Sequence, residues 1–245
     1  ETPSAREFRT GTMDLLKNQL IQDPFFGENY KKIDWVFEQD WTYRLRFDIP
    51  KEDFARPVIS LSFAMVDTFA DVFVNDVLVG KTDSMFHPFA FDIKKAIKSG
   101  PNEVRVVLHS IRQAMRDLHN TKYKASFNND RPLIRKAQCH FGWDWAPDFP
   151  GTGIAGDVKL YCCDGYLLDN VFPQTELDGR VGFIVETAKN NRYPGEWEET
   201  KGFSVRLSVS KKPGELSKDC YQVQRPLFGA ENLLNVIIKN PELWY

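Results

Sequence analysis

One ten-residue segment strongly constrains how the front of this chain can fold. Between Asp40 and Ile49 every second residue is apolar and the residues between them are polar. A period of two is typical of a β-strand with one buried face, whereas a helix repeats its apolar residues every three to four positions. The segment therefore predicts a strand whose buried face carries Trp41, Tyr43, Leu45, Phe47 and Ile49.

Similar short segments recur through the front of the chain and predict strand after strand. They lie at 58–64, 71–74, 77–81, 104–108 and 158–162. Asn75 and Asp76 stand between two of them, and both residue types tolerate the positive φ of a tight hairpin turn. Two short helices are expected, near Thr12–Ile21 and at Ser110–His119. The pattern is all-β and not βαβ.

A second domain is expected after a stretch rich in proline and glycine that runs from Pro147 to Gly165. We place the boundary near Asp164, which gives domains of residues 1–164 and 165–245. The later strands are expected near 182–187, 203–210, 219–224 and 233–239. They suggest a small β-sandwich that is immunoglobulin-like in architecture only, because Cys163, Trp197 and Cys220 lack the antibody-type spacing.

Composition excludes several classes of function. A net charge of -2 gives no electrostatic bias toward nucleic acid, and the longest apolar runs, such as Leu233–Ile238, are too short to cross a bilayer. We therefore expect neither nucleic acid nor membrane as a partner. The four cysteines are too few and too irregular for a disulfide framework, so reduced thiols are expected. The four histidines lack metal-ligand spacing, so no metal or other cofactor is expected.

The segment Arg135–Gly151, which reads RKAQCHFGWDWAPDFPG, carries the candidate site. Its glycines and prolines predict a loop, in which Trp143, Asp144 and Trp145 could converge on one pocket. An indole offers a flat apolar face to a sugar ring, and a carboxylate accepts hydrogen bonds from neighbouring hydroxyls. The alternative is structural: the two tryptophans plug the end of the sandwich and Asp144 caps backbone amides.

No residue of the chain is nominated as catalytic. A glycosidase needs two carboxyl groups, held about 5 Å apart in retaining enzymes. The cluster Glu196, Glu198 and Glu199 lies in a polar stretch flanked by proline and glycine, which favours a solvated connection. Asp117 with His119, and Asp148 with His140, are better interpreted as surface residues than as acid/base pairs.

The motif FGWDWAP closely resembles the end of the first domain in β-mannosidases of glycoside hydrolase family 2. Further stretches resemble the same family, and together they cover most of residues 10–165 and the tail. They read TGTMDLLKNQLIQDPFFGENYKKIDWVFEQDWTYRLRFDIP, VDTFADVFVNDVLVGKT, HPFAFDI and NPELWY. Departures concern the loop: Ala146 stands where glycine is common, and Gly153–Asp157 replaces a Gly-Ile-Trp-Arg-Pro-like stretch.

The resemblance implies a jelly-roll, galactose-binding-like β-sandwich followed by an immunoglobulin-like sandwich. In the intact enzyme a (β/α)₈ barrel with both catalytic glutamates would follow, and this chain alone would be inactive. It also implies a first strand missing before TGTMDLL and at least one strand missing after NPELWY. Trp143, Asp144 and Trp145 would reach into the barrel's pocket and bind a terminal β-mannoside as substrate.

Two alternatives stay open at this point. One is the front region of a β-galactosidase or β-glucuronidase, against which the Trp-Asp-Trp run argues. The other is a free-standing carbohydrate-binding or interaction module, because sandwiches of this type host many functions. The absence of any Asn-x-Ser/Thr sequon favours a bacterial cytoplasmic protein over a lysosomal or secreted one.

Overall fold

The computed structural model describes residues 9–119, 131–188, 199–210, 221–229 and 231–239. The chain divides into two compact units, Glu1–Cys162 and Cys163–Tyr245. We describe each unit by itself. Within the described residues, no helix combines the length and the apolar character needed to cross a membrane.

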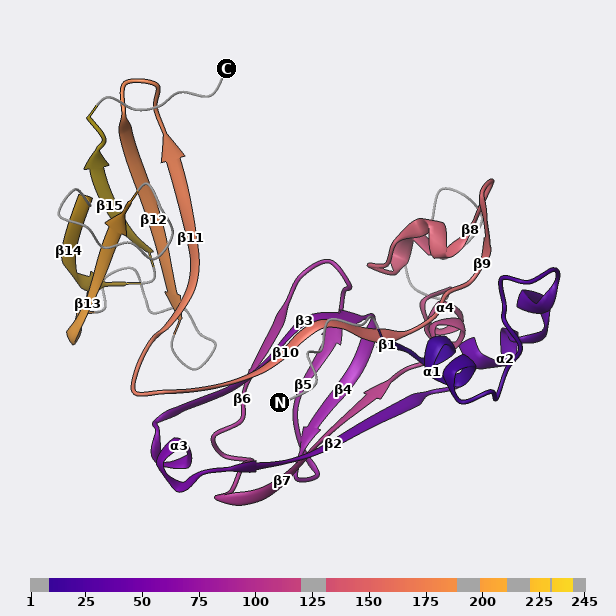
Figure 1. Ribbon diagram of the computed structural model, residues 1–245. Helices are drawn as coiled ribbons and strands as arrows, with labels where there is room; N and C mark the ends of the chain where they lie inside the picture. The colour runs from indigo at the N-terminus through magenta and orange to yellow at the C-terminus, as the bar shows by residue number, and fades with distance from the viewer. Residues whose placement is uncertain (1–8, 120–130, 189–198, 211–220, 230, 240–245) are drawn as a thin grey trace. The chain divides into compact units, whose positions relative to one another are not determined.

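Unit 1 consists mainly of antiparallel strands arranged in two four-stranded sheets (Figure 1). One sheet has the order β1-β10-β3-β6, with strands Arg9–Thr10, Gly153–Cys163, Val58–Asp67 and Phe89–Asp92. The other has the order β2-β7-β4-β5, with strands Trp41–Ile49, Gly100–Leu108, Phe69–Val74 and Val77–Asp83.

The core of unit 1 is formed by apolar side chains from both sheets. Residues from β3, β4 and β7 dominate it, and Ile59, Val66, Val72, Val74 and Leu108 have no exposed surface. Two sheets that share one apolar core form a β-sandwich. The prediction of an all-β jelly-roll sandwich is thus confirmed.

A glycine brings the two sheets of unit 1 into close contact. A Cβ atom on Gly80 of β5 would lie 2.1 Å from the Phe91 ring of β6, so no larger residue fits there.

In the hairpin that joins β4 to β5, Asn75 and Asp76 adopt φ of 48° and 65°, as the sequence predicts. The β4–β5 turn is therefore built from the two residue types that, after glycine, best tolerate this backbone.

Three of the four short α-helices described in unit 1 lie at one end of the sandwich (Figure 1). The α-helices are α1 (Gly11–Lys17), α2 (Asp34–Phe37), α3 (Lys51–Ala55) and α4 (Ile111–His119), and the 3₁₀ helices are η1 (Asn29–Lys32), η2 (Arg131–Leu133) and η3 (Gln138–His140). Figure 1 shows α1, α2 and α4 at the same end as the hairpin of β8 (Phe141–Trp143) and β9 (Ala146–Asp148), with α3 at the other. A second apolar cluster of Leu15, Ile33, Val36 and Phe37 lies there.

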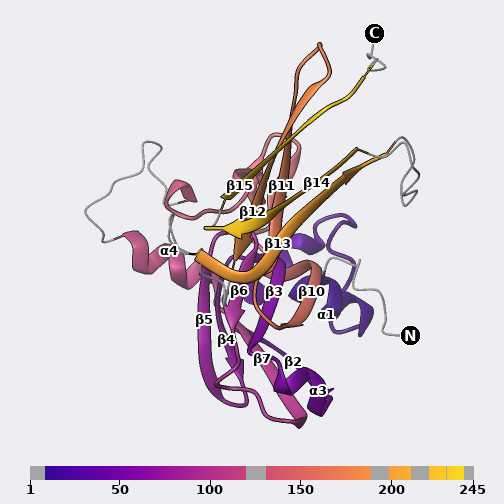
Figure 2. The same cartoon turned by 90° about the vertical axis from the view of Figure 1, so that its left-hand side faces the viewer.

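Unit 2 contains a three-stranded sheet, β11-β12-β15, and a two-stranded sheet, β13-β14 (Figure 2). In chain order, strands β11 to β15 are Leu167–Thr175, Arg180–Ala188, Glu199–Val209, Tyr221–Phe228 and Glu231–Ile237. Buried Val185 and Leu234 come from one sheet and buried Leu227 comes from the other. This agrees with the predicted immunoglobulin-like sandwich. Trp197 and Cys220 lie outside the described residues.

Candidate functional site

The Trp-Asp-Trp segment forms the tip of a short β-hairpin and not an irregular loop. Strand β8 (Phe141–Trp143) pairs with β9 (Ala146–Asp148), and the register joins Phe141 to Asp148 and Trp143 to Ala146. Asp144 and Trp145 therefore make a two-residue turn. The sequence prediction of a loop was wrong here because three-residue strands carry too little periodicity to be detected.

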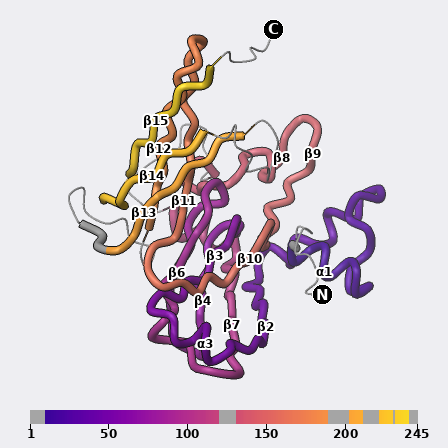
Figure 3. Tube along the Cα trace, turned by 60° about the vertical axis from the view of Figure 1, so that its left-hand side comes forward, coloured from indigo at the N-terminus to yellow at the C-terminus, as the bar shows by residue number. Residues whose placement is uncertain are grey.

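The strands of this hairpin depend on one glycine. Gly142 has φ of 90°, a conformation that residues with a side chain rarely adopt. In the middle of a three-residue strand, such a residue turns the backbone sharply and redirects the following side chain. Figure 3 shows the hairpin standing off from β3 and β10. The sequence thus encodes a projecting tip.

The three candidate residues are exposed at this tip. Trp143 is 52% exposed and Trp145 is 71% exposed. Asp144 is also exposed and makes no hydrogen bond or ion pair with the described residues. The structural alternative, in which the tryptophans plug the sandwich and Asp144 caps backbone amides, is therefore wrong. An enclosed sugar pocket would need a second surface facing the tip.

An arginine that sequence reasoning missed braces Trp143. The guanidinium carbon of Arg131 lies 5.8 Å from the centroid of the Trp143 ring, within the range of a cation–π contact. Its Nη1 also donates a hydrogen bond to the carbonyl oxygen of Gly142 at 3.4 Å. Arg131 holds the indole from one side. No sequence spacing signals this contact, because the two residues belong to different local elements.

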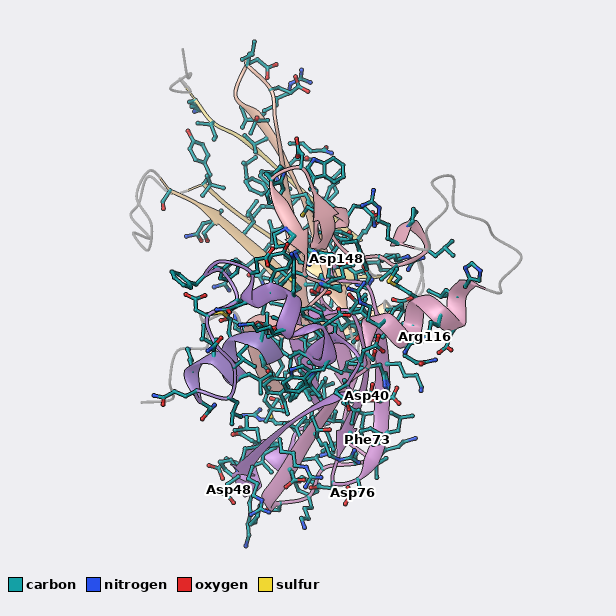
Figure 4. All side chains as sticks on the ribbon, turned by 90° about the vertical axis from the view of Figure 1, so that its right-hand side faces the viewer. Asp40, Asp48, Phe73, Asp76, Arg116 and Asp148 are labelled. Atoms are coloured by element: carbon teal, nitrogen blue, oxygen red, sulfur yellow. The ribbon has the colours of Figure 1, made fainter. Side chains whose placement is uncertain are left out.

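The carboxyl-side arm of the hairpin is fixed to the helices of unit 1. Arg112 of α4 donates to Asp148 at 2.9 Å and to Asp34 at 3.0 Å (Figure 4 labels Asp148). The Phe149 ring packs edge-on against Phe37, with the ring centroids 5.1 Å apart. Asp148 is thus engaged with Arg112, whereas His140, which was expected at the surface, is half-buried.

The base of the hairpin segment contains a buried charged cluster. The Lys136 ammonium group forms an ion pair with Asp67, the last residue of β3, and both side chains are almost completely buried. The ammonium also donates to the carbonyl oxygen of Gly151 at 2.6 Å. Burial lowers the pKa of Lys136 from its ordinary value, while the Asp67 carboxylate opposes this shift. Sequence reasoning missed this cluster because an isolated lysine usually indicates a surface.

His140 lies beside this cluster, in surroundings that predict a pH-dependent contribution to stability. Its Nδ1 is 3.9 Å from Asp67 Oδ2 and is buried without a hydrogen bond among the described residues. Burial and the positive charge of Lys136 lower the pKa of His140 below its ordinary 6.5, against the opposing effect of Asp67. The folded state therefore binds fewer protons than the unfolded state just below that pH.

We expect the fold to lose stability as the pH falls through the ordinary histidine range, and to lose less of it in His140→Gln. A folded-state pKa below the unfolded value makes folding less favourable from about pH 6.5 downward until the folded-state value is passed. The measurement is the Tm of both proteins between about pH 7.5 and 5.5. His87→Gln, at an exposed position, is the matched control. Parallel profiles for wild type and His140→Gln would refute this expectation.

The described residues hold no cluster of three or more side chains suited to bind a metal ion. Cys139, Cys162 and Cys163 are half-buried, whereas Cys220 lies outside the described residues. Of the carboxylate cluster, Glu196 and Glu198 also lie outside them, and Glu199 begins β13. The tip of the β8–β9 hairpin is therefore the best candidate site.

Comparison with known families gives this geometry its context. A family model described as glycosyl hydrolase 2 galactose-binding domain-like matches residues 6–156. This match and the sandwich fold define a front region of a glycoside hydrolase. The chain belongs to glycoside hydrolase family 2.

Its relatives include several β-mannosidases, which confirms the resemblance found in the sequence. The chain is 34% identical to β-mannosidase of Bos taurus over 156 residues, which is 60% of this chain and 18% of that protein. It is 29% identical to β-mannosidase B of Thermothelomyces thermophilus over 241 residues, which is 95% of this chain and 27% of that protein. The chain thus spans less than a third of either relative.

A solved structure extends the likeness to both units. The crystal structure of β-D-mannosidase from Dictyoglomus thermophilum matches 97% of this chain with a TM-score of 0.81 and 29% sequence identity. The match covers 29% of that protein. The remainder of that enzyme has no counterpart in the present chain.

Proposed function

We propose that this chain is the non-catalytic front region of a retaining exo-β-mannosidase, an enzyme that removes terminal β-D-mannose residues. In this proposal residues 1–164 form the jelly-roll domain and residues 165–245 form the immunoglobulin-like sandwich. The glutamates that act as acid/base and nucleophile belong to a (β/α)₈ barrel outside this chain. The β-mannosidase relatives support this assignment.

The observation that carries the proposal is that the residues of the hairpin tip are exposed while the hairpin itself is held in place. Trp143 and Trp145 are exposed and Asp144 is unpaired among the described residues, yet the hairpin that presents them is braced at its side and at its base. Exposed indoles on a braced support are typical of a binding surface. The indoles would pack on the C–H face of the mannose ring while the Asp144 carboxylate accepts hydrogen bonds from its hydroxyls.

The test is hydrolysis of chromogenic glycosides by the 245-residue chain and by the full-length product of its reading frame. We expect no hydrolysis by the chain alone, and a preference of the full-length protein for β-mannoside over β-galactoside and β-glucuronide. Preference for either of the other two sugars would assign the chain to the front region of a β-galactosidase or β-glucuronidase. Hydrolysis by the chain alone would refute the assignment as non-catalytic.

The second candidate is a free-standing carbohydrate-binding module, which the same exposed indoles favour. The two functions differ in the affinity of the isolated chain. A tip that forms only one wall of a pocket covers too little of a monosaccharide to offset the entropy lost on binding. We therefore expect weak or absent binding of mannose by calorimetry, whereas a submillimolar Kd would support the module.

A further inference from the structure

The most unusual buried group in unit 1 is the Lys136 side chain, which is 0% exposed. Transfer of a lysine ammonium out of water is unfavourable, and a buried ion pair seldom stabilises a protein more than apolar side chains of similar volume. Core packing alone therefore gives no reason for a lysine at this position. The hydrogen bonds of its ammonium group explain why a lysine stands there.

The Lys136 ammonium connects three places that are distant in sequence. Lys136 and Gly151 are the two ends of the segment that carries the hairpin, and the ammonium donates across this gap to the Gly151 carbonyl oxygen at 2.6 Å. Asp67, its ion-pair partner, belongs to the core strand β3. An ammonium group has three donors, so it can bind both acceptors at once, which no apolar side chain can do.

The Asp67 end of this connection is itself held in place. The Thr68 hydroxyl donates to the second carboxylate oxygen of Asp67, and the Thr82 hydroxyl of β5 donates to the Thr68 carbonyl oxygen at 2.7 Å. All three residues are buried. Asp67 is thus fixed to strands of both sheets, and Lys136 transmits that position to the hairpin segment.

A ladder of hydrogen bonds leads from this base to the tip. The Phe149 amide donates to the His140 carbonyl oxygen at 2.7 Å, next to the paired residues Phe141 and Asp148. Trp143 and Ala146 form the last pair before the turn. The position of the base therefore sets the direction in which the tip projects.

We propose that Lys136 is a positioning residue that joins both ends of the hairpin segment to Asp67 and thereby fixes Trp143, Asp144 and Trp145 relative to the sandwich. This inference rests on the proposed function only for its consequence in catalysis. Its structural part concerns the 245-residue chain alone and is testable without a substrate.

The test is hydrogen exchange, followed by mass spectrometry, of the chain and its Lys136→Met variant. We expect amides of residues 138–149 to exchange about tenfold faster in the variant, while strands β4 and β7 keep their protection. Unchanged exchange at 138–149 would overturn the proposal. Lys159→Met, which removes an exposed ion pair with Asp157 in the same unit, is the matched control and should leave the hairpin unchanged.

A double variant separates positioning from charge compensation and remains informative if Lys136→Met fails to fold. Lys136→Met with Asp67→Asn removes both buried charges and leaves Thr68 an acceptor, so its Tm should recover relative to Lys136→Met. We expect the hairpin to exchange fast in the double variant as well, because the bond to Gly151 is still missing. Recovery of hairpin protection together with Tm would show that Lys136 only compensates Asp67.

The catalytic consequence is measured in the full-length protein. If Trp143–Trp145 bind the sugar, the double variant should have a several-fold lower kcat/KM for a β-mannoside than the wild type. Its Tm should nevertheless be higher than that of Lys136→Met. If Asp144→Ala leaves kcat/KM unchanged while the Lys136 variants show faster hydrogen exchange in the hairpin, the proposed function fails and the positioning role stands. If exchange is normal in the Lys136 variants while Asp144→Ala has a large effect, the positioning role fails and the proposed function stands.

Discussion

Asp144→Ala is expected to lower kcat/KM for a β-mannoside by more than about tenfold in the full-length protein, which corresponds to about 1.4 kcal/mol. A carboxylate that binds sugar hydroxyls should contribute most in the transition state, where the ring changes shape and charge. Asp144 is exposed and has no partner among the described residues, so its replacement should change stability by less than about 0.5 kcal/mol. Steady-state kinetics and Tm measure the two effects.

Asp48→Ala is the matched control for this prediction. Asp48 is an exposed aspartate in β2 of the same unit, and Figure 4 shows it at the opposite end of the unit from Asp148, the last residue of β9. Its replacement removes the same charge without touching the hairpin, so both kcat/KM and Tm should stay at wild-type values. A variant Asp144→Ala that unfolds, or one with wild-type kinetics, would contradict the binding role.

The strands of unit 1 were predictable from sequence because local pattern and turn chemistry agree there. The alternation from Trp41 to Ile49 became β2, and the Asn75-Asp76 pair became the β4–β5 turn. The alternation failed in one respect: Leu45 was expected on the buried face and is 60% exposed. β2 is an edge strand, and Leu45 is exposed although Val104, its partner in the next strand β7, is buried.

Strand β11 of unit 2 went undetected for a different reason. Its apolar residues stand in the pairs Leu167-Leu168 and Val171-Phe172, which give no period of two, and the strand includes Pro173. It is an edge strand whose pairing with β12 shifts register between Leu168 and Asn170. Proline is tolerated at such an edge, because one side of the strand needs no ladder hydrogen bonds. Pairing with β12, the next strand along the chain, forms this strand, and such pairing leaves no periodic pattern within the segment itself.

The candidate site likewise contains residues whose role the sequence suggests and residues whose role only the fold reveals. The residue types of Trp143, Asp144 and Trp145 already suggest sugar binding, since their chemistry is local. The residues that hold them, Arg131 and Lys136, act through contacts made only after folding. Lys136 lies within the segment Arg135–Gly151, but a sequence offers no means of telling a buried lysine from an exposed one. The partner that reveals its burial, Asp67, is 69 positions away.

Phe63→Ala is expected to destabilise unit 1 by about 3–5 kcal/mol, a far larger effect than any surface change. Phe63 is 1% exposed in the middle of the core, and its ring meets that of Phe91 edge-on with centroids 6.2 Å apart. Truncation removes this contact and leaves a cavity between two sheets whose spacing is fixed where Gly80 meets Phe91. The rigid sheets cannot close around the cavity.

The contrast with Leu45→Ala tests whether burial and not residue type sets this cost. Leu45 is an apolar strand residue of the same unit, but its 60% exposure means that alanine loses little contact, and we expect a change below about 0.5 kcal/mol. Urea unfolding followed by tryptophan fluorescence measures both variants, since Trp41 packs against this core. Equal midpoints for the two variants would mean that the sheets do not share one core, and the assignment of unit 1 as a β-sandwich would fall with them.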